Sequence, residues 1–184
     1  MAIPELPEKI FMDAVEGITA YAANTIPTKS GTSLYIRPFI IATEESLGIR
    51  PSLEYKFLVL SSPSESYFIN SNINVFIERN LSRAVKGGTG RAKTGGNYAA
   101  SLFTTLKAQK LGFTNTLWLD AETHSNIEEM SGMNFFAVID NKLVTPKLTD
   151  TILEGITRKS ILELAKIEGI PCSEETLSIN SFIG

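Results

Sequence analysis

The chain has 184 residues, of which 43% are hydrophobic and 20% are charged, so its composition is that of an ordinary globular protein. Its formal net charge of -3 excludes a broad basic field for nucleic acid, and its single cysteine, Cys172, excludes an intrachain disulfide. The stretch MAIPELPEKI is too charged for a signal peptide, and no apolar run approaches the roughly 18 residues of a membrane span. We therefore expect a soluble, cytoplasmic protein that binds neither nucleic acid nor a membrane.

The first third of the chain predicts one helix and two strands. Apolar residues between positions 10 and 21 fall on one helical face. GTSLYIRPFIIA predicts a strand in which Tyr35 and Arg37 share one face, and its Pro38 indicates a sheet edge or a bulge. EYKFLVLSSP predicts a second strand, which Pro63 stops.

The remaining two thirds alternate strand and helix patterns. Residues 61–74 are rich in Ser and Asn and predict a surface connection or a linker, with NVFIER as a short strand. Residues 99–111 predict a helix, and NTLWLD predicts a short buried strand. GMNFFAVIDNKLVTP predicts a hairpin that turns at Asp140 and Asn141. A helix over residues 157–168 and a strand in ETLSIN complete the pattern.

The glycine-rich stretch GGTGRAKTGGNYAASL raises the question of whether it is a phosphate-binding P-loop. Lys93 and Thr94 match the end of G-x-x-x-x-G-K-[ST], but Ala92 stands where the second glycine belongs. A P-loop also opens a helix at its lysine, whereas Gly95 and Gly96 follow here and each costs about 1 kcal/mol in a helix. We therefore expect the helix to begin later and do not favour a P-loop.

A lysine displayed for covalent chemistry is the alternative interpretation of Lys93. A deprotonated amine can form a Schiff base with an aldehyde cofactor or a carbonyl substrate. The nearby cations Arg83, Lys86 and Arg91 would lower its pKa if they were close in space, and they could also hold a phosphate. A solvated basic loop with glycines at its turns explains the same spacing.

Several longer sequence stretches help to distinguish between these interpretations of Lys93. RAVKGGTGRAKTGGNYAASL, followed by LWLD, IEEMSGMNFFAVIDNKLVTP and ILEGITRKSILELA, resembles branched-chain amino acid aminotransferases, which are fold-type IV pyridoxal-phosphate enzymes. The upstream stretch GTSLYIRPFIIATEESLGIRPS resembles that family's small domain. The resemblance implies an α/β (α+β) fold with the C-terminal part of a small α/β domain in residues 1–70. It also implies an interdomain linker in residues 71–80 and the N-terminal part of an incomplete, barrel-like large domain in residues 81–184.

The resemblance also implies a reaction. The amino group of Leu, Ile or Val would pass to 2-oxoglutarate by a ping-pong mechanism with pyridoxal 5'-phosphate, in a cytoplasmic homodimer of branched-chain amino acid biosynthesis. Another fold-type IV enzyme, such as a D-amino acid aminotransferase or a lyase, is a second interpretation. A third is a non-catalytic remnant that binds pyridoxal phosphate, or pairs with a complementary chain, without turnover. No metal site is expected.

The family's pattern assigns roles around the cofactor. Lys93 matches the lysine that binds the pyridoxal-phosphate aldehyde and then moves protons at the substrate. Arg83 matches the arginine that binds the cofactor phosphate, where a guanidinium offers two hydrogen bonds and a permanent charge. Tyr98 matches a tyrosine whose hydroxyl approaches the cofactor's phenolic oxygen, although a core aromatic is the alternative. Glu129 matches the carboxylate paired with the pyridine nitrogen, and Glu128 is expected to be a bystander on the opposite face of the strand.

Two further segments receive roles from the resemblance. Gly155, Ile156 and Thr157 would stand at a helix N-terminus, where backbone N–H groups and the helix dipole attract an anion such as the cofactor phosphate. Tyr35 and Arg37 would line the substrate side, Tyr35 against the side chain and Arg37 near carboxylates, although both could be purely structural.

The family's chains are about twice this length, and this is the main departure from the pattern. One phosphate-binding arginine and the later loops that bind the phosphate and the substrate carboxylate have no counterpart here. An opened barrel would leave unpaired strand edges and exposed core. We therefore expect a fragment, a truncated gene product or a misannotated reading frame, weakly folded or inactive when isolated.

Overall fold

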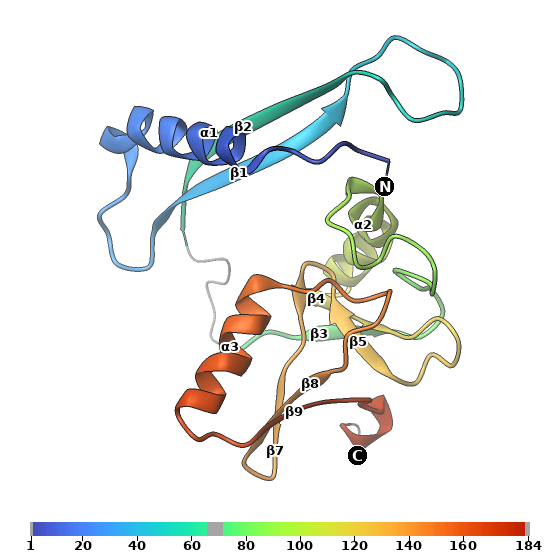
Figure 1. The fold of residues 1–184 in the computed structure, drawn as a ribbon. Coiled ribbons are helices and arrows are strands. Elements are labelled where there is room, and N and C mark those ends of the chain that lie inside the picture. The colour runs from blue at the N-terminus through green and yellow to red at the C-terminus, as the bar shows by residue number, and fades with distance from the viewer. Residues whose placement is uncertain (1, 66–71, 183–184) are drawn as a thin grey trace. The chain divides into compact units, whose positions relative to one another are not determined.

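The computed structural model describes residues 2–65 and 72–182 as a mixed arrangement of helices and strands (Figure 1). The chain divides into two compact units, Met1–Ser71 and Asn72–Gly184, and each is described by itself. Within the described residues, no helix is long and apolar enough to cross a membrane.

The first unit is one helix on a two-stranded antiparallel sheet. Helix α1 (Glu8–Tyr21) packs against the hairpin of β1 (Ser33–Ala42) and β2 (Tyr55–Ser64), and the rings of Phe11 and Phe57 lie 6.2 Å apart. None of the residues of α1 is buried, because a single hairpin covers only one side of the helix. The predicted helix and both predicted strands are confirmed.

The two prolines of this hairpin show what an edge strand tolerates. Pro63 was expected to stop the second strand, but it lies inside β2 opposite Leu34, so that expectation is wrong. Proline lacks only the N–H, and an edge strand can present that position to solvent without losing a ladder hydrogen bond. Pro38 pairs with Val59 in an unbroken register, so it marks an edge and not a bulge.

The second unit contains a four-stranded sheet in the order β3-β4-β5-β6, in which β3 and β4 run parallel. These four strands are Val75–Glu78, Asn115–Leu119, Ile127–Met130 and Met133–Asn134. Helix α2 (Gly95–Lys110) makes the crossover between the parallel strands, as a parallel connection requires. Strand β3 falls within residues 71–80, the predicted linker, and belongs to this sheet.

A three-stranded sheet and one helix complete the second unit. The strands β7 (Ala137–Ile139) and β8 (Lys142–Pro146) form the predicted hairpin, and β9 (Cys172–Glu175) runs parallel to β8. The turn residues Asp140 and Asn141 have φ of 48° and 61°, the left-handed conformation that a two-residue hairpin turn needs. The hairpin prediction is therefore confirmed.

Two predicted boundaries in this unit are wrong. Helix α2 begins at Gly95, not after Asn97, because the Asn97 side chain binds the preceding loop and fixes the first helical turn. The stretch ETLSIN contributes only its first residue to β9, and it ends in a 3-10 helix at Ile179–Ser181. Helix α3 (Ile156–Ile167) lies where a helix was expected.

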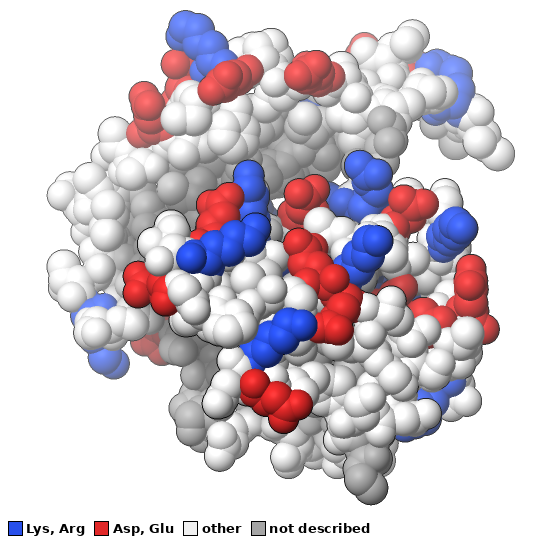
Figure 2. All heavy atoms as spheres, turned by 60° about the horizontal axis from the view of Figure 1, so that its bottom comes forward, with Lys and Arg blue, Asp and Glu red and all other residues white. Residues whose placement is uncertain are grey.

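The core of the second unit lies between its two sheets. Its buried apolar residues are Leu117, Leu119, Ile127, Val144, Leu177 and Ile179. All five residues of β4 are buried, which confirms the buried strand predicted from NTLWLD. On the face drawn in Figure 2, Lys and Arg side chains are interspersed with Asp and Glu, so this face carries charges of both signs.

Candidate active site in the second unit

The predicted lysine stands on a loop that one asparagine holds in place. Lys93 is exposed on the segment between β3 and α2. The buried Asn97, in the first turn of α2, donates to the carbonyls of Thr89 (2.6 Å) and Ala92 (2.8 Å). Its Oδ1 accepts a hydrogen bond from the Thr89 hydroxyl at 2.8 Å. Asn97 therefore fixes the backbone immediately before Lys93, a role that the sequence patterns did not reveal.

The same loop is closely packed against the segment that follows β8. At Gly90 a Cβ atom would lie 2.6 Å from the Cα of Thr151, so no side chain fits there. The backbone N–H of Arg91 donates to the carbonyl of Asp150 at 2.9 Å. The Lys93 Nζ lies 4.9 Å from the centroid of the Tyr98 ring, within the range of a cation–π contact. Two separate segments thus hold the lysine loop, and the Tyr98 ring lies beside its lysine.

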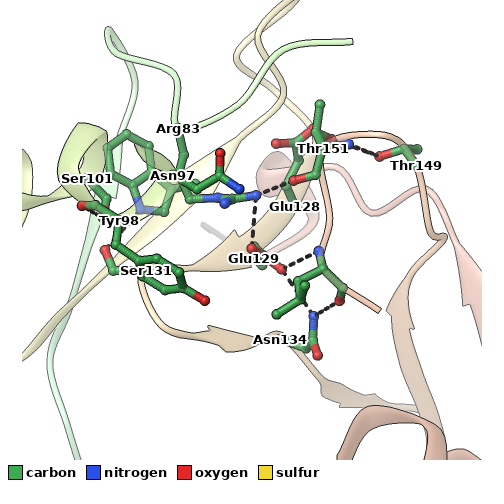
Figure 3. Close-up of polar contacts among 12 residues, drawn as sticks. Arg83, Asn97, Tyr98, Ser101, Glu128, Glu129, Ser131, Asn134, Thr149 and Thr151 are labelled. Atoms are coloured by element: carbon green, nitrogen blue, oxygen red, sulfur yellow. Dashed lines mark hydrogen bonds and ion pairs between the residues drawn. The ribbon is translucent and has the colours of Figure 1, made fainter. Parts of the chain in front are cut away.

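Glu129 on β5 is the centre of a buried polar cluster (Figure 3). Its Oε1 lies 2.9 Å from Nη2 of Arg83, a salt bridge in which both side chains are less than one tenth exposed. Its Oε2 accepts hydrogen bonds from the N–H of Leu153 and from Nδ2 of Asn134, each at 3.1 Å. The carboxylate is thus bound at both oxygens by groups from three different segments.

Burial decides the protonation of this carboxyl group. Desolvation is the largest cause and raises the pKa of Glu129 from 4.5 to about 7, although Arg83 and the Leu153 N–H act in the opposite direction. The neighbouring Glu128 raises the pKa further, and the charge of Lys93 lowers it. Glu129 therefore exchanges its proton near neutral pH, which is the property required of a group that shares a proton with a ligand.

Arg83 lies deeper than its predicted role suggested. Only 8% of this residue is exposed, and its Nη2 also donates to the carbonyl of Thr151. Its Nε is buried and has no hydrogen-bond partner among the described residues. Arg83 is therefore the counterion of Glu129 and still has one donor available for an anion.

Glu128 was expected to be a bystander, but it is buried and hydrogen-bonded. Its Oε1 accepts from the hydroxyl of Thr151, and burial raises its pKa. It lines a cavity of about 490 Å³ whose other charged residues are Lys86, Asp120, Glu122, Lys147, Asp150 and Glu175. Glu128 therefore contributes to the packing of the 149–151 segment, although no role is assigned to it in a reaction.

The N-terminus of α3 lies close to this cluster along the chain. Gly155 is the N-cap, and no side chain caps the helix there. Ile156 and Thr157 open the helix with exposed side chains, so their N–H groups stand in the anion-attracting first turn. Leu153, which binds Glu129, precedes this turn by only a few residues and places it beside the buried carboxylate.

The other two predicted residues lie in the first unit. Tyr35 and Arg37 are neighbours on one face of β1, as expected, with Arg37 Nη2 donating to the Tyr35 hydroxyl at 3.0 Å. The guanidinium carbon also lies 5.2 Å from the Tyr35 ring centroid. The structure therefore brings Lys93, Tyr98, Arg83 and Glu129 into one unit and pairs Tyr35 with Arg37 in the other.

Comparisons with known proteins identify the family to which this chain belongs. Residues 9–183 match the family model described as amino-transferase class IV. Branched-chain-amino-acid transaminase 1 of Bacillus subtilis (strain 168) is 44% identical over 183 residues, which are 98% of this chain and 51% of that protein. The chain thus spans about half the length of the curated relatives it matches.

Solved structures show the same fold. The branched-chain amino acid aminotransferase of Escherichia coli superposes with a TM-score of 0.80 at 29% identity, over 97% of this chain and 58% of that one. A branched-chain amino acid aminotransferase from T.th., complexed with N-(5'-phosphopyridoxyl)-L-glutamate, has a TM-score of 0.80 at 26% identity, over 97% and 56% of the two chains. These similarities confirm the fold class expected from the sequence.

Proposed function

The chain belongs to the class IV amino-transferase family, and from this premise we propose that it carries the cofactor-binding part of a branched-chain amino acid aminotransferase. The reaction would transfer the amino group of Leu, Ile or Val to 2-oxoglutarate by a ping-pong mechanism. The names of the relatives and structural neighbours support this substrate class. The neighbour with a bound phosphopyridoxyl-glutamate supports both the cofactor and the glutamate couple. A homodimer in the cytoplasm, without nucleic-acid or membrane partners, belongs to the same proposal.

The described residues fit pyridoxal 5'-phosphate. The observation that carries the proposal is an exposed lysine whose charge acts on a buried carboxyl group of the same unit, Glu129, which pairs with Arg83 and whose pKa is raised to about 7. An aldehyde needs the Lys93 amine, and a ring nitrogen needs the proton-sharing carboxylate of Glu129. A phosphate needs donors, which the free Nε of Arg83 and the uncapped first turn at Ile156 and Thr157 offer.

Each residue has a distinct task in this proposal. The cofactor, when bound, supplies an electron sink for bond changes at the substrate α-carbon. Lys93 takes and returns a proton through Nζ, and its position is set by the loop that Asn97 holds. Glu129 holds a proton against the ring nitrogen, and the Tyr98 hydroxyl donates toward the phenolic oxygen. Tyr35 and Arg37 would contact the substrate, one through an apolar ring and one through a guanidinium.

The test is a titration of the purified chain with pyridoxal phosphate, followed by its visible absorbance. We expect a band in the wild-type chain that Lys93→Ala abolishes, and borohydride reduction should attach the cofactor to a peptide containing Lys93. A folded wild-type chain without a band would contradict the cofactor assignment. Lys142→Ala, which replaces a half-exposed lysine of the same unit, is the matched control and should keep the band.

Donor specificity separates the proposal from its alternatives. Glutamate formation from 2-oxoglutarate with Leu, Ile and Val but not with D-alanine would support the branched-chain assignment. Preference for D-alanine would instead indicate a D-amino acid aminotransferase of the same fold. A chain that binds the cofactor without turnover is one further candidate. A visible band with no glutamate from any donor would support that candidate.

A further inference from the structure

The carboxylate of Glu129 is held unequally at its two oxygens. Oε1 meets the charged Arg83, whereas Oε2 accepts from Asn134 Nδ2 and from the N–H of Leu153. Asn134 stands directly opposite Glu129 in the β5–β6 register, so the two side chains are cross-strand neighbours. The same Nδ2 donates to the carbonyl of Leu153 at 2.8 Å. Asn134 therefore links the carboxylate to the backbone segment that leads into α3 (Figure 3).

The orientation of the Asn134 amide follows from its neighbours. Nδ2 faces two acceptors, Oε2 of Glu129 and the carbonyl of Leu153. Turning the amide over would place its own oxygen against both of them, which is repulsive because none of the three atoms carries a proton when the carboxyl is charged. The amide thus has one favourable orientation, with Oδ1 directed at Gly155.

Gly155 supplies the space for that orientation. A Cβ atom at Gly155 would lie 2.3 Å from Oδ1 of Asn134, a separation that no side chain can accept. The φ of Gly155 is -72°, which any residue adopts, so backbone conformation does not require a glycine here. The requirement is room for the Asn134 amide.

We propose that Asn134 is a positioning residue that orients the Glu129 carboxylate toward its ligand. Gly155 is needed because only a residue without a side chain leaves room for the Asn134 amide in this orientation. The proposal rests on the proposed function for the identity of the ligand, since the ring nitrogen of pyridoxal phosphate is the group that Glu129 would meet. The contacts among Glu129, Asn134 and Gly155 do not depend on that function.

The first test needs no cofactor. A hydrogen-bond donor to a carboxylate favours its charged form, so Asn134→Ala should raise the pKa of Glu129 by about one in a carboxyl NMR titration, with Glu129→Gln used for assignment. Gly155→Ala, which displaces the amide but leaves Asn134 in place, should shift the same pKa in the same direction. Asn126→Ala replaces an asparagine whose side-chain amide, among the described residues, hydrogen-bonds to Thr123 alone, and it should leave the pKa of Glu129 unchanged.

The second test is a double-mutant cycle read by thermal unfolding of the cofactor-free chain. If Gly155→Ala acts through the Asn134 amide, adding it to Asn134→Ala should cost little further stability, because the atom it collides with is gone. Additive losses would show that the two positions are independent and would overturn the proposal. Should Asn134→Ala fail to fold, Gly155→Ala carries the NMR test alone.

The third test asks whether the positioning role of Asn134 affects the binding of pyridoxal phosphate. Pyridoxal phosphate should bind about tenfold more weakly to Asn134→Ala, and the pH midpoint of its visible band should move, whereas Asn126→Ala should behave as wild type. A wild-type chain without a visible band would contradict the proposed function. The NMR and stability measurements would still test whether Asn134 positions Glu129, because neither requires the cofactor. An unchanged Glu129 pKa in a folded Asn134→Ala chain would overturn the positioning role even if the cofactor binds.

Discussion

Replacing Asn97 by alanine tests how much the Asn97 side chain contributes to holding the loop that carries Lys93. The substitution removes three hydrogen bonds, two donated by Nδ2 to backbone carbonyls and one accepted by Oδ1 from a hydroxyl. It removes no charge and creates little empty volume, and it leaves Lys93 and Tyr98 in place. The measured effect would therefore report the attachment of the loop to the first turn of α2.

The structure sets the size of the effect. A net hydrogen bond contributes about 1 kcal/mol, so the three bonds amount to roughly 3 kcal/mol before correction. Thr89 is exposed, and water replaces part of what its groups lose. Alanine is also a better helix former than asparagine by about 0.6 kcal/mol. We expect a loss of about 2 kcal/mol in the unfolding free energy of the second unit, a sizeable share of the 5–15 kcal/mol typical of a domain.

Urea unfolding followed by tryptophan fluorescence measures this loss. Trp118 is the only tryptophan of the chain, lies fully buried in β4, and donates to Ser131 Oγ at 3.0 Å, so it reports on the second unit. Asn180→Ala is the control, because that side chain is exposed at the surface. A midpoint shift no larger in Asn97→Ala than in Asn180→Ala would refute the reasoning. Pyridoxal-phosphate binding should weaken together with stability, since the backbone next to Lys93 loosens.

Two further outcomes are expected. Because burial raises the pKa of Glu129 to about 7, the folded chain binds more protons than the unfolded chain between about pH 4.5 and pH 7. The contribution of Glu129 to the unfolding free energy is then fully present below about pH 4.5 and is lost as the pH rises through 7, on the order of 3 kcal/mol. Glu129→Gln should flatten this dependence in urea titrations at a series of pH values, and a parallel dependence would contradict the assignment. Gly90→Ala should destabilise the second unit by about 1–3 kcal/mol, because its Cβ would meet the backbone of Thr151, whereas Gly96→Ala, at an open position, should not destabilise it.

Much of the fold could be predicted because it depends on local chemistry. The turn at Asp140 and Asn141 follows from residues that accept a left-handed backbone, and α3 follows from its apolar periodicity. Errors arose where the surroundings in the folded chain override a local preference. The unfavourable glycines at the start of α2 are accepted because Asn97 binds the loop before them. Pro63 is accepted because, in the part of the chain that the structure describes, its strand has no neighbour on one side.

In the candidate site, too, some residues could be predicted from the sequence and others could not. Lys93, Tyr98 and Glu129 were found by motif, and the structure places them in one unit. That Arg83 pairs with Glu129 could not be predicted, because the two come from different segments and meet only through the tertiary fold. Asn134 did leave a signal, since an asparagine within the apolar stretch GMNFF is expected to lose part of its contact with water and therefore to need a hydrogen-bond partner.

The contacts around Glu129 join parts of the chain that are far apart in sequence, and this has a consequence for folding kinetics. Arg83 reaches the carbonyl of Thr151 across 68 residues, and Leu153 reaches Glu129 across 24. The entropy of closing such long loops is recovered only after the sheet strands have found their register. We therefore expect the polar cluster around Glu129 to form late, because its contacts require the completed sheet. A ligand that binds there selects the completed second unit and, by mass action, slows or reverses its unfolding as a whole.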